Sequence, residues 1–524
     1  MLWLALHPPQ LSLEAFCATL PTAQQGRAVA LLAAHRISAA NVEALQRGVQ
    51  PGLKRATALA LVGDLLIGQA DAARDAQALL ALAHAALAFT PSVTLDEPHT
   101  VLLEVQASLR YFGGHSALLR RLREALAPLG HPLCIASAPT ALGAALLARW
   151  RDGLAEGAHS TQLKALQTLL DGAPVWLLGP GREHWQALQG MGLHTLGDLR
   201  ALPRAGLARR FGDSLLDALD RARGSAADPR AWLSCPATFD AQLELFTRAD
   251  TSQQLLHAAS MLLARLVAWA RAQRSRVLAF VLVMTHEARH RETFIPSTEL
   301  RIELASPSDD ATHLQALLRE RLAACQLAAP TLSLRLHCHE LARSEAPSGE
   351  LFPTQRSESE GLTRLLERLR ARLGEAQVQW LAPLQDHRPE RTGRLQGVAQ
   401  SAVALRVSKL RSTPPSSTEP PPPPRPLWLL PQAQPLPERG ALPLLDGQAL
   451  QLLAGPERIE AGWWDQNEAG TGVGADTGAG AGLATRDYFV AQSSSGALVW
   501  IYRTRLPAVA ASEQAGWFLH GRFG

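Results

Sequence analysis

Cysteine is scarce in this chain, and the few cysteines form no metal or disulfide pattern. The 524 residues include five cysteines that stand far apart, with no Cys-x-x-Cys pair: Cys17, Cys134, Cys235, Cys325 and Cys338. Structural zinc sites usually pair closely spaced cysteines, and disulfide-stapled folds are small and dense in cysteine, so we expect reduced thiols in a cytosolic protein. His337-Cys338-His339 resembles a ligand set, but neighbouring residues of a strand point to opposite faces, so we expect no metal there.

Strong charge and long apolar runs are also missing. No segment reaches the roughly 18 consecutive apolar residues of a membrane span. No basic region precedes the apolar start of the chain, so we expect no signal peptide. The formal net charge is only +4, which permits nucleic-acid contact through local patches without requiring it. These features favour a cytoplasmic protein, and its length predicts three to five domains.

The most informative stretch runs from Phe89 to Gly114. Val101–Val105 is a short apolar run between Pro98 and a Gly-Gly pair, which predicts a buried strand followed by a turn and a helix. The stretch opens with aromatic-Thr-Pro and closes with Ser-Leu-Arg-aromatic-Phe-Gly. In this form it resembles the palm of Y-family (lesion-bypass) DNA polymerases.

The resemblance implies that the catalytic groups of those polymerases are replaced here. Nucleotidyl transfer uses two divalent ions about 4 Å apart, and carboxylate oxygens hold them. The ungapped count puts other residues at these positions: Leu6 and Pro8 for the first Asp-x-Asp, His99 and Thr100 for the Asp-Glu pair, and Val42, Leu45 and Ala141 for the Tyr, Arg and Lys that contact the nucleotide. We therefore expect no catalysis, no bound metal and no cofactor.

Two other interpretations stay open. Asp96, Glu97 and Glu104 lie close to the same strand, and an active but atypical lesion-bypass polymerase would take its metal ligands from them. Using the first two as the pair shifts the frame by three and brings Pro98 into the strand, where a backbone donor is needed. The other interpretation is a protein-interaction scaffold that never touches DNA.

Residues 174–224 predict a DNA-binding thumb. They resemble the helix-hairpin-helix thumb of the same polymerases, with Gly179-Pro180-Gly181 as the tight turn and Arg182–Gln189 as the second helix. Such hairpins direct backbone N–H groups at a DNA phosphate. The arginines also suit solvated helix faces, but we favour DNA contact. The DNA-binding candidates are Gly179, Gly181, Arg182, Arg204, Arg209 and Arg210.

Residues 237–344 have the order strand, helix, strand, strand, helix, strand, which fits the little finger that these polymerases add beyond the thumb. Two segments resemble the extended peptides that bind the bacterial sliding clamp. One contains Gln242, Leu243, Leu245 and Phe246, which match the pattern better but fall inside the first strand. The other contains Glu350, Leu351 and Phe352 in a predicted linker. We favour the second, because a docked peptide must be accessible.

The C-terminal part reads as a helix, a linker and a separate module. A leucine stripe over 358–373 suits packing or a partner, and the proline-rich stretch 413–426 predicts an extended linker. Residues 426–524 hold four strand-like, Trp-rich segments and a Gly/Ala tract between Trp464 and Arg486 that predicts a disordered loop. The motifs GPERIEAGWW, RDYFVA and WFLHG resemble the non-catalytic Y-family homologues of bacterial mutagenesis cassettes.

This resemblance covers nearly the whole chain and implies an α+β multidomain fold. The expected parts are a palm (1–25 and 89–170), fingers (26–88), a thumb (171–232), a little finger (237–344), a linker with a helix (345–425) and a β-rich interaction module (426–524). The implied function is a catalytically inactive DNA-binding adaptor in SOS-induced translesion synthesis, associated with the bacterial nucleoid. Implied partners are damaged primer-template DNA, the sliding clamp, an ImuA-type RecA-like protein and an error-prone C-family DNA polymerase.

Overall fold

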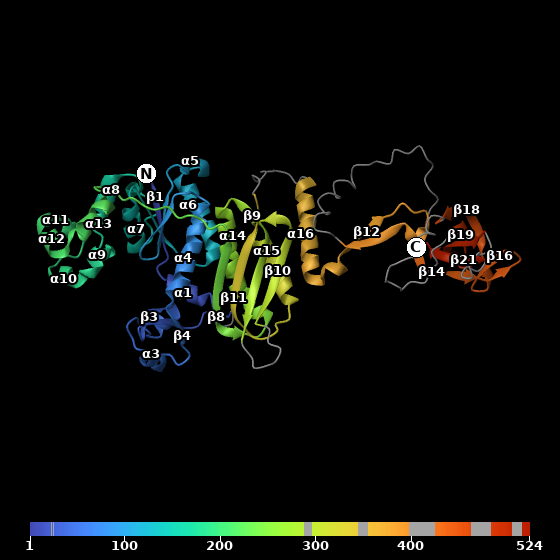
Figure 1. Cartoon of the computed structure of the whole chain (residues 1–524), viewed down its shortest axis with the longest axis horizontal. Coiled ribbons are helices and arrows are strands. Elements are labelled where there is room, and N and C mark those ends of the chain that lie inside the picture. The colour runs from blue at the N-terminus through green and yellow to red at the C-terminus, as the bar shows by residue number, and fades with distance from the viewer. Residues whose placement is uncertain are drawn as a thin grey trace. The chain divides into compact units, whose positions relative to one another are not determined.

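The computed structural model describes residues 1–21, 24, 26–287, 296–343, 355–397, 425–462, 484–505 and 516–523. In the helix over 355–373 it describes side chains from Gly361 onward. The chain forms two compact units, Met1–Arg372 and Leu373–Gly524 (Figure 1). The first mixes helices and sheets and the second is mainly β-strand, which confirms the fold class expected from the sequence.

A four-stranded antiparallel sheet organises the first part of the first unit. Its order is β5-β6-β1-β7, with β1 (Trp3–His7), β5 (Val93–Asp96), β6 (Thr100–Glu104) and β7 (Cys134–Ala138). Because side chains alternate along a strand, β1 contributes to two cores. Leu4 and Leu6 pack into one core, and Trp3 and Ala5 pack into the other. The buried strand predicted within Phe89–Gly114 is thus confirmed as β6.

Helices cover both faces of this sheet. They are α1 (Leu11–Cys17), α4 (Ala72–Leu87), α5 (Leu109–Phe112), α6 (His115–Leu126), η2 (Ala127–Leu129), α7 (Ala141–Trp150) and η3 (Ala158–Ser160). Asp71 caps α4 by accepting from the N–H groups of Ala73 and Arg74. Ser12, a possible cap of α1 from its sequence, lies inside that helix, and its hydroxyl donates to Asp75 on α4 instead.

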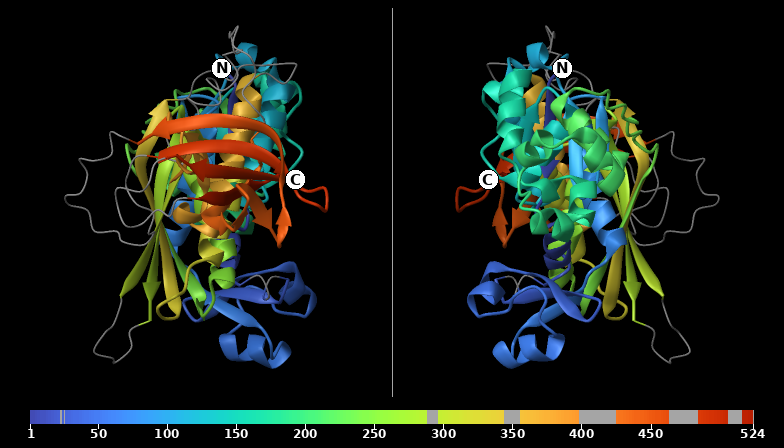
Figure 2. Two further views of the ribbon diagram at one scale, coloured as in Figure 1. Left: turned by 90° about the vertical axis from the view of Figure 1, so that its right-hand side faces the viewer. Right: turned by 90° about the vertical axis from the view of Figure 1, so that its left-hand side faces the viewer.

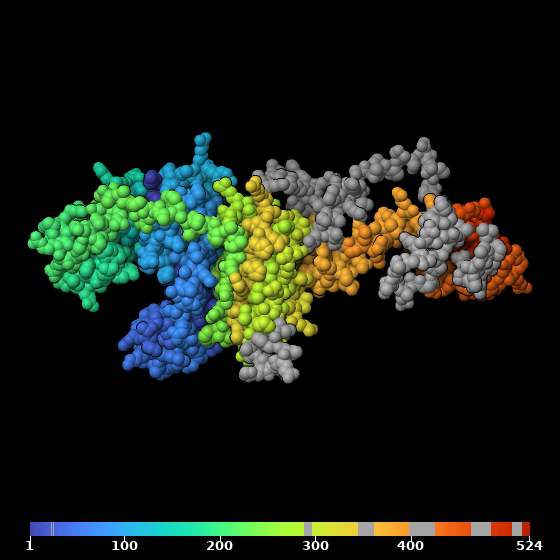
Figure 3. Space-filling view, viewed as in Figure 1, coloured from blue at the N-terminus to red at the C-terminus, as the bar shows by residue number. Residues whose placement is uncertain are grey.

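A small α/β lobe lies between α1 and α4 in sequence. It contains β2 (Val29–Ala33), β3 (Arg36–Ala40), α2 (Val42–Gln46), α3 (Arg55–Leu61) and β4 (Leu66–Gln69), and its sheet order is β3-β2-β4. Ile37, Val49 and Val62 are buried in a core of its own. Figure 3 shows this lobe (dark blue) as a surface separate from the helical lobe that follows η3 (green).

The helical lobe consists of α8 (Leu163–Asp171), η4 (Val175–Leu177), α9 (Gly179–Glu183), α10 (Trp185–Gly190), α11 (Leu196–Ala201), α12 (Arg204–Phe211) and α13 (Asp213–Arg223). Its leucines share one core with α7 and with Trp3 of β1. The sheet and the helical lobe are therefore packed together directly.

The rest of the first unit has the predicted strand-helix-strand-strand-helix-strand order. Its elements are β8 (Phe239–Ala249), α14 (Ser252–Ala272), β9 (Ser275–His286), β10 (Ser297–Ser308), α15 (Ala311–Ala323), β11 (Thr331–Arg343) and then α16 (Gln355–Leu373). The antiparallel sheet has the order β10-β9-β11-β8. By length and composition, α14 is the one described helix apolar enough to cross a membrane, but 67% of it is buried, as in a core helix.

The second unit is built from β-sheets. A hairpin pairs β12 (Gln379–Pro383) with β13 (Gly393–Gly397). The short helix η5 (Glu375–Gln377) precedes β12, and η6 (Pro389–Arg391) lies in the connection between the two strands. The five strands of the main sheet lie side by side in the order β14-β21-β20-β19-β18 (Figure 2). They are β14 (Trp428–Leu436), β18 (Gln451–Ala461), β19 (Ala484–Gln492), β20 (Leu498–Thr504) and β21 (Trp517–Arg522).

A small sheet of β15 (Glu438–Arg439), β16 (Leu442–Leu445) and β17 (Gln448–Ala449) completes this unit. The unit begins at Leu373, so it includes the β12–β13 hairpin as well as the module expected from residue 426. The proline-rich linker, apart from its last two residues, and the Gly/Ala tract lie outside the described residues.

Candidate functional site

The palm positions singled out in the sequence come together where β1 ends and β6 begins. Thr100 is fully buried, and its hydroxyl lies 3.0 Å from the carbonyl oxygen of Pro98, to which it donates. Nδ1 of His7 lies 3.1 Å from the carbonyl oxygen of His99 and 3.3 Å from the Thr100 hydroxyl. Since a carbonyl only accepts, Nδ1 of His7 carries the proton in this arrangement.

The side chain next to Thr100 is His7 rather than Leu6. Leu6 pairs with Val101 across the two strands, and both side chains enter the core on the opposite face of the sheet. Pro8 is buried just beyond the end of β1. The ungapped count along the sequence selected Leu6 and Pro8. These residues flank His7, which is the residue that faces Thr100.

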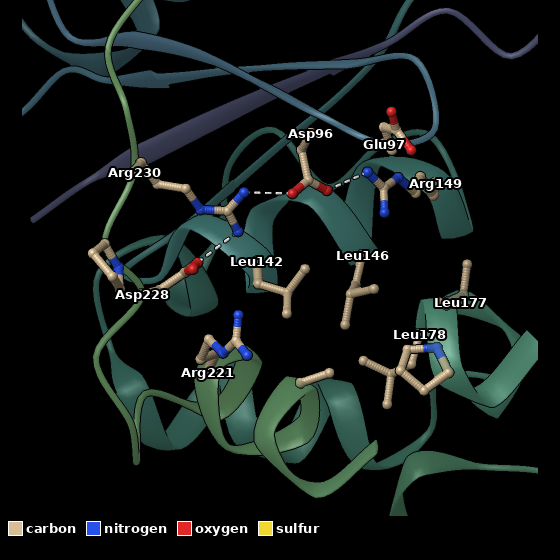
Figure 4. Close-up of a pocket in the computed structure, with 14 residues that line it drawn as sticks. Asp96, Glu97, Leu142, Leu146, Arg149, Leu177, Leu178, Arg221, Asp228 and Arg230 are labelled. Carbon is tan, nitrogen blue, oxygen red and sulfur yellow. Dashed lines mark hydrogen bonds and ion pairs between the residues drawn. The ribbon is translucent and has the colours of Figure 1, made fainter. Parts of the chain in front are cut away.

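An ion-pair network is centred on Asp96 (Figure 4). Asp96, at the end of β5, is bonded through one carboxylate oxygen to Arg149 of α7 and through the other to Arg230, at 2.5 Å. Arg149 also donates from Nε to the Thr100 hydroxyl at 3.0 Å, and Arg230 donates to Asp228 at 2.7 Å. Both oxygens of Asp96 are thus already occupied by guanidinium groups.

Burial is deep enough for these charges to matter. The Arg149 side chain is only 5% exposed and that of Asp96 12%. Burial lowers the pKa of Arg149 even though Asp96 favours the charged form. Burial also lowers the pKa of His7, and the positive charges of Arg149 and Arg182 lower it further. Arginine side chains therefore lie beside His7 and Thr100, the palm positions singled out in the sequence.

The other acids near the strand are not arranged around a common point. Glu97 is exposed at the β5–β6 turn. Glu104 lies at the far end of β6, opposite Trp3, and its carboxylate accepts from the backbone N–H of Gln106 at 3.1 Å. Among the described residues, no three His, Cys, Asp or Glu side chains cluster so as to hold a metal ion.

The residues expected in place of the triphosphate ligands are apolar and dispersed. Val42 and Leu45 are 58% and 40% exposed on α2 in the separate small lobe. Ala141 is buried as the first residue of α7, where the Thr140 side chain caps the helix by accepting from the N–H of Gly143. None of these three side chains can bind a phosphate.

The segments expected as the tight turn and the second helix, residues 179–189, form α9 and most of α10 in the helical lobe. Gly179-Pro180-Gly181 forms the first turn of α9 and is not the tight turn. Helix α10 ends at Gly190, Gly192 adopts the left-handed conformation (φ +77°), and α11 begins after Thr195. Thr195 and Asp198 form a capping box there, and backbone hydrogen bonds of the cap lower the pKa of Asp198.

Because Gly181 lies inside α9, its role differs from the one expected in a tight turn. It is buried, and a Cβ atom added to it would press into the carbonyl oxygen of Val175. Its small size is therefore required for packing between α9 and η4. Gly179 has open space around it. Gly190 to Gly192, between α10 and α11, are exposed.

The arginines of the lobe fall into two kinds. Arg204 makes a two-pronged ion pair with Asp220, at 3.0 and 2.5 Å. Arg182, Arg209 and Arg210 are exposed, and the guanidinium of Arg210 lies over the Phe211 ring at 5.7 Å. The exposed arginines are available to a phosphate, whereas Arg204 must leave Asp220 to reach one.

Of the two clamp-binding candidates, Glu350, Leu351 and Phe352 lie outside the described residues. In the other, Gln242 is exposed on the edge strand β8, and Leu243 and Leu245 pack into the sheet core. The Phe246 ring is 37% exposed and meets Phe16 edge to face at 5.2 Å. Binding of this segment to a clamp would break those packing contacts.

A cavity of about 290 Å³ adjoins the Asp96 network on the side of the helical lobe (Figure 4). Leu142, Leu146 and Leu178 form its apolar wall, and Arg221 points in from α13. Sequence reasoning missed this site because the residues that bind Asp96 are far from it in the chain. Arg149 is 53 positions away and Arg230 is 134 positions away. No local pattern signals such a pairing.

Comparison with known proteins supplies the family. No family model matches the chain. Protein ImuB from two strains of Caulobacter vibrioides, NA1000 / CB15N and ATCC 19089 / CIP 103742 / CB 15, is 30% identical over 493 residues, which cover 91% of this chain and all of each relative.

The solved structures found include a ternary complex of Dbh and an insertion ternary complex of Dbh DNA polymerase, at 13% and 14% identity. Each covers 66% of this chain and all of that chain, with a TM-score of 0.36. A Y-family DNA polymerase chimera of Dbh and Dpo4 matches at 14% identity with a TM-score of 0.35. The family therefore rests on the full-length sequence matches: this chain belongs to the ImuB family.

Proposed function

We propose that this polymerase-like protein is a catalytically inactive, DNA-binding adaptor in translesion synthesis during the SOS response. One observation carries the proposal: Asp96, which pairs with Thr100 across β5 and β6, gives both carboxylate oxygens to arginines, and His7 is the side chain beside Thr100. Nucleotidyl transfer needs carboxylates free to hold two cations. Guanidinium groups at that point repel magnesium instead.

Primer extension tests the loss of catalysis. Full-length protein, a primer-template, Mg²⁺ and all four nucleotides are expected to give no extension above a reaction without protein. An active Y-family polymerase in the same buffer is the positive control. Extension that depends on the protein and is lost in Asp96→Asn would instead support the atypical polymerase that uses Asp96, Glu97 or Glu104.

DNA binding is proposed for the exposed basic surface of the helical lobe. Arg209 and Arg210 lie in the last turn of α12, and both are exposed. Charge reversal of both is expected to weaken binding to a primer-template. It should also reduce the slope of log K against log salt by roughly 2, because each phosphate contact contributes about 0.9.

Arg394→Glu with Arg439→Glu in the second unit is the matched control, since both arginines are exposed and lie outside the lobe. Equal losses in both variants would mean that the effect comes from net charge alone. Unchanged binding in the Arg209 and Arg210 variant would favour the protein-interaction scaffold that never touches DNA.

The remaining partners are proposed from family membership. They are the sliding clamp, an ImuA-type RecA-like protein and an error-prone C-family DNA polymerase that performs the synthesis. For the clamp, Leu351→Ala with Phe352→Ala is expected to lower binding at least about tenfold, which corresponds to about 1.4 kcal/mol. Phe246→Ala tests the other segment, which packing against Phe16 supports as structural.

A further inference from the structure

Helix α16 is attached to the first unit in an unusual way, through a buried charge. The carboxylate of Glu367, a residue 8% exposed, accepts from the backbone N–H of Ala305 at 2.5 Å and of Ser306 at 3.4 Å. Its other oxygen lies 2.7 Å from Nε2 of His313 on α15. A carboxylate held by two N–H groups and an imidazole fixes the rotation of the helix about its axis.

The fixed rotation turns three leucines of α16 away from the fold, while Leu366 stays half-buried. At about 100° per residue, Thr363, Glu367 and Ala371 share the docked face. Leu362, Leu365 and Leu369 share another face, and they are 38%, 51% and 36% exposed. An amphipathic helix normally buries its apolar stripe and exposes its charge. Here the charge is buried and these three leucines face solvent.

Beside the leucine face runs a basic face. Arg364, Arg368 and Arg372 follow one another at four-residue spacing, and all three are exposed. Arg364 bonds to Asp310 at 3.0 Å. Since Glu367 is the only acid from Gly361 to Leu373 and is consumed in docking, the outer surface of the helix combines leucine with positive charge.

We propose that this surface, Leu362, Leu365 and Leu369 with Arg368 and Arg372, binds an amphipathic helix of a partner protein that carries acidic residues beside its apolar stripe. Helix-in-groove and helix-on-helix recognition reads apolar anchors at three- and four-residue spacing, which these leucines provide. Opposite charge along the flank sets orientation and the rate of encounter.

Charge disfavours the two other occupants. A second copy of α16 would bring two arginine rows together. The chain's own segment 400–412 has apolar residues at a suitable spacing, but its charged residues are Arg406, Lys409 and Arg411, with no acid. Both alternatives place like charges side by side, which costs binding free energy at an interface.

Two synthetic amphipathic helices of roughly 20 residues test the proposal. Both carry the same leucine stripe, with glutamate beside it in one and lysine beside it in the other. The full chain is expected to bind the glutamate helix at least about tenfold more tightly, by fluorescence anisotropy at low salt. Leu365→Ser with Leu369→Ser should abolish that binding, and Leu61→Ser, at an exposed leucine elsewhere, should leave it intact.

Arg368→Glu with Arg372→Glu gives a sharper result, since it should reverse the preference toward the lysine helix. Equal affinity for both helices, or no binding to either, overturns the proposal. A dimer of the full chain that Leu365→Ser with Leu369→Ser dissolves would show that a second copy is the occupant. Tighter peptide binding after deletion of 400–412 would show that this segment of the chain occupies the surface. DNA binding and primer extension are separate readouts, so failure here leaves the proposed function standing.

Discussion

Replacing Asp96 with asparagine separates an ion-pair network from a metal site. Asparagine keeps the shape of the side chain but removes its charge, so Arg149 and Arg230 lose their shared partner. Removing one partner of a buried ion pair costs roughly 3–5 kcal/mol. Because Arg149 keeps Thr100 and Arg230 keeps Asp228, we expect the lower end, about 3 kcal/mol of unfolding free energy in the first unit.

Hydrogen exchange offers a local assay. Arg230 belongs to the segment that joins α13 to β8, and the N–H of Leu233 in this segment donates to the carbonyl of Val93 at 2.8 Å. Trp232 stacks on Trp3 of β1, with ring centroids 5.9 Å apart. A loss of about 3 kcal/mol should accelerate exchange of the Leu233 amide on the order of 100-fold if the segment opens locally.

A metal-binding role for Asp96 predicts different results. If Asp96 were a metal ligand, Asp96→Asn in magnesium-free buffer would leave exchange and the urea midpoint unchanged, and added Mg²⁺ would protect only the parent protein. Asp64→Asn is the control, because that exposed carboxylate pairs with Arg47 on the surface and should have no measurable effect. Replacing Asp96 and Arg149 together by leucine and methionine should recover part of the loss, since no buried charge is then left without its partner.

Two further predictions concern other parts of the chain. Gly181→Ala should destabilise the helical lobe by about 1–3 kcal/mol, because the new methyl group presses on the Val175 carbonyl. Gly179→Ala should be neutral or slightly stabilising, because the space around Gly179 is open. Thermal unfolding of the two variants compares them directly. Burial lowers the pKa of His520 to about 4, below its unfolded value, so the unfolded state binds more protons and stability falls with pH below about 6.5. Between pH 6.5 and 5 the second unit should lose about 1.5 kcal/mol, and His520→Gln should flatten this dependence in urea unfolding followed by near-UV circular dichroism. An equally steep loss in that variant would contradict the assignment.

Much of the fold followed from local patterns. The apolar run at 101–105 became β6 because short apolar segments between turn residues favour strands over helices. The strand and helix order of residues 239–343 was likewise readable, since alternation along LSLRLHCHE has the period of a half-exposed strand. Gly179-Pro180-Gly181, expected as a tight turn, is instead the first turn of α9, because proline suits both a turn and the first turn of a helix.

The sequence by itself determined which side chains are absent from the palm: no carboxylate stands at the positions that the family resemblance marks, and this follows from a count along the chain. Only the tertiary structure decided what stands there instead. His7 reaches Thr100 because two antiparallel strands set their register, and Arg149 and Arg230 reach Asp96 because α7 and the segment before β8 pack beside β5. The same holds for α16. Its leucine stripe suggests a buried face, but Glu367 binds Ala305, Ser306 and His313 and so fixes the helix with three of its leucines exposed.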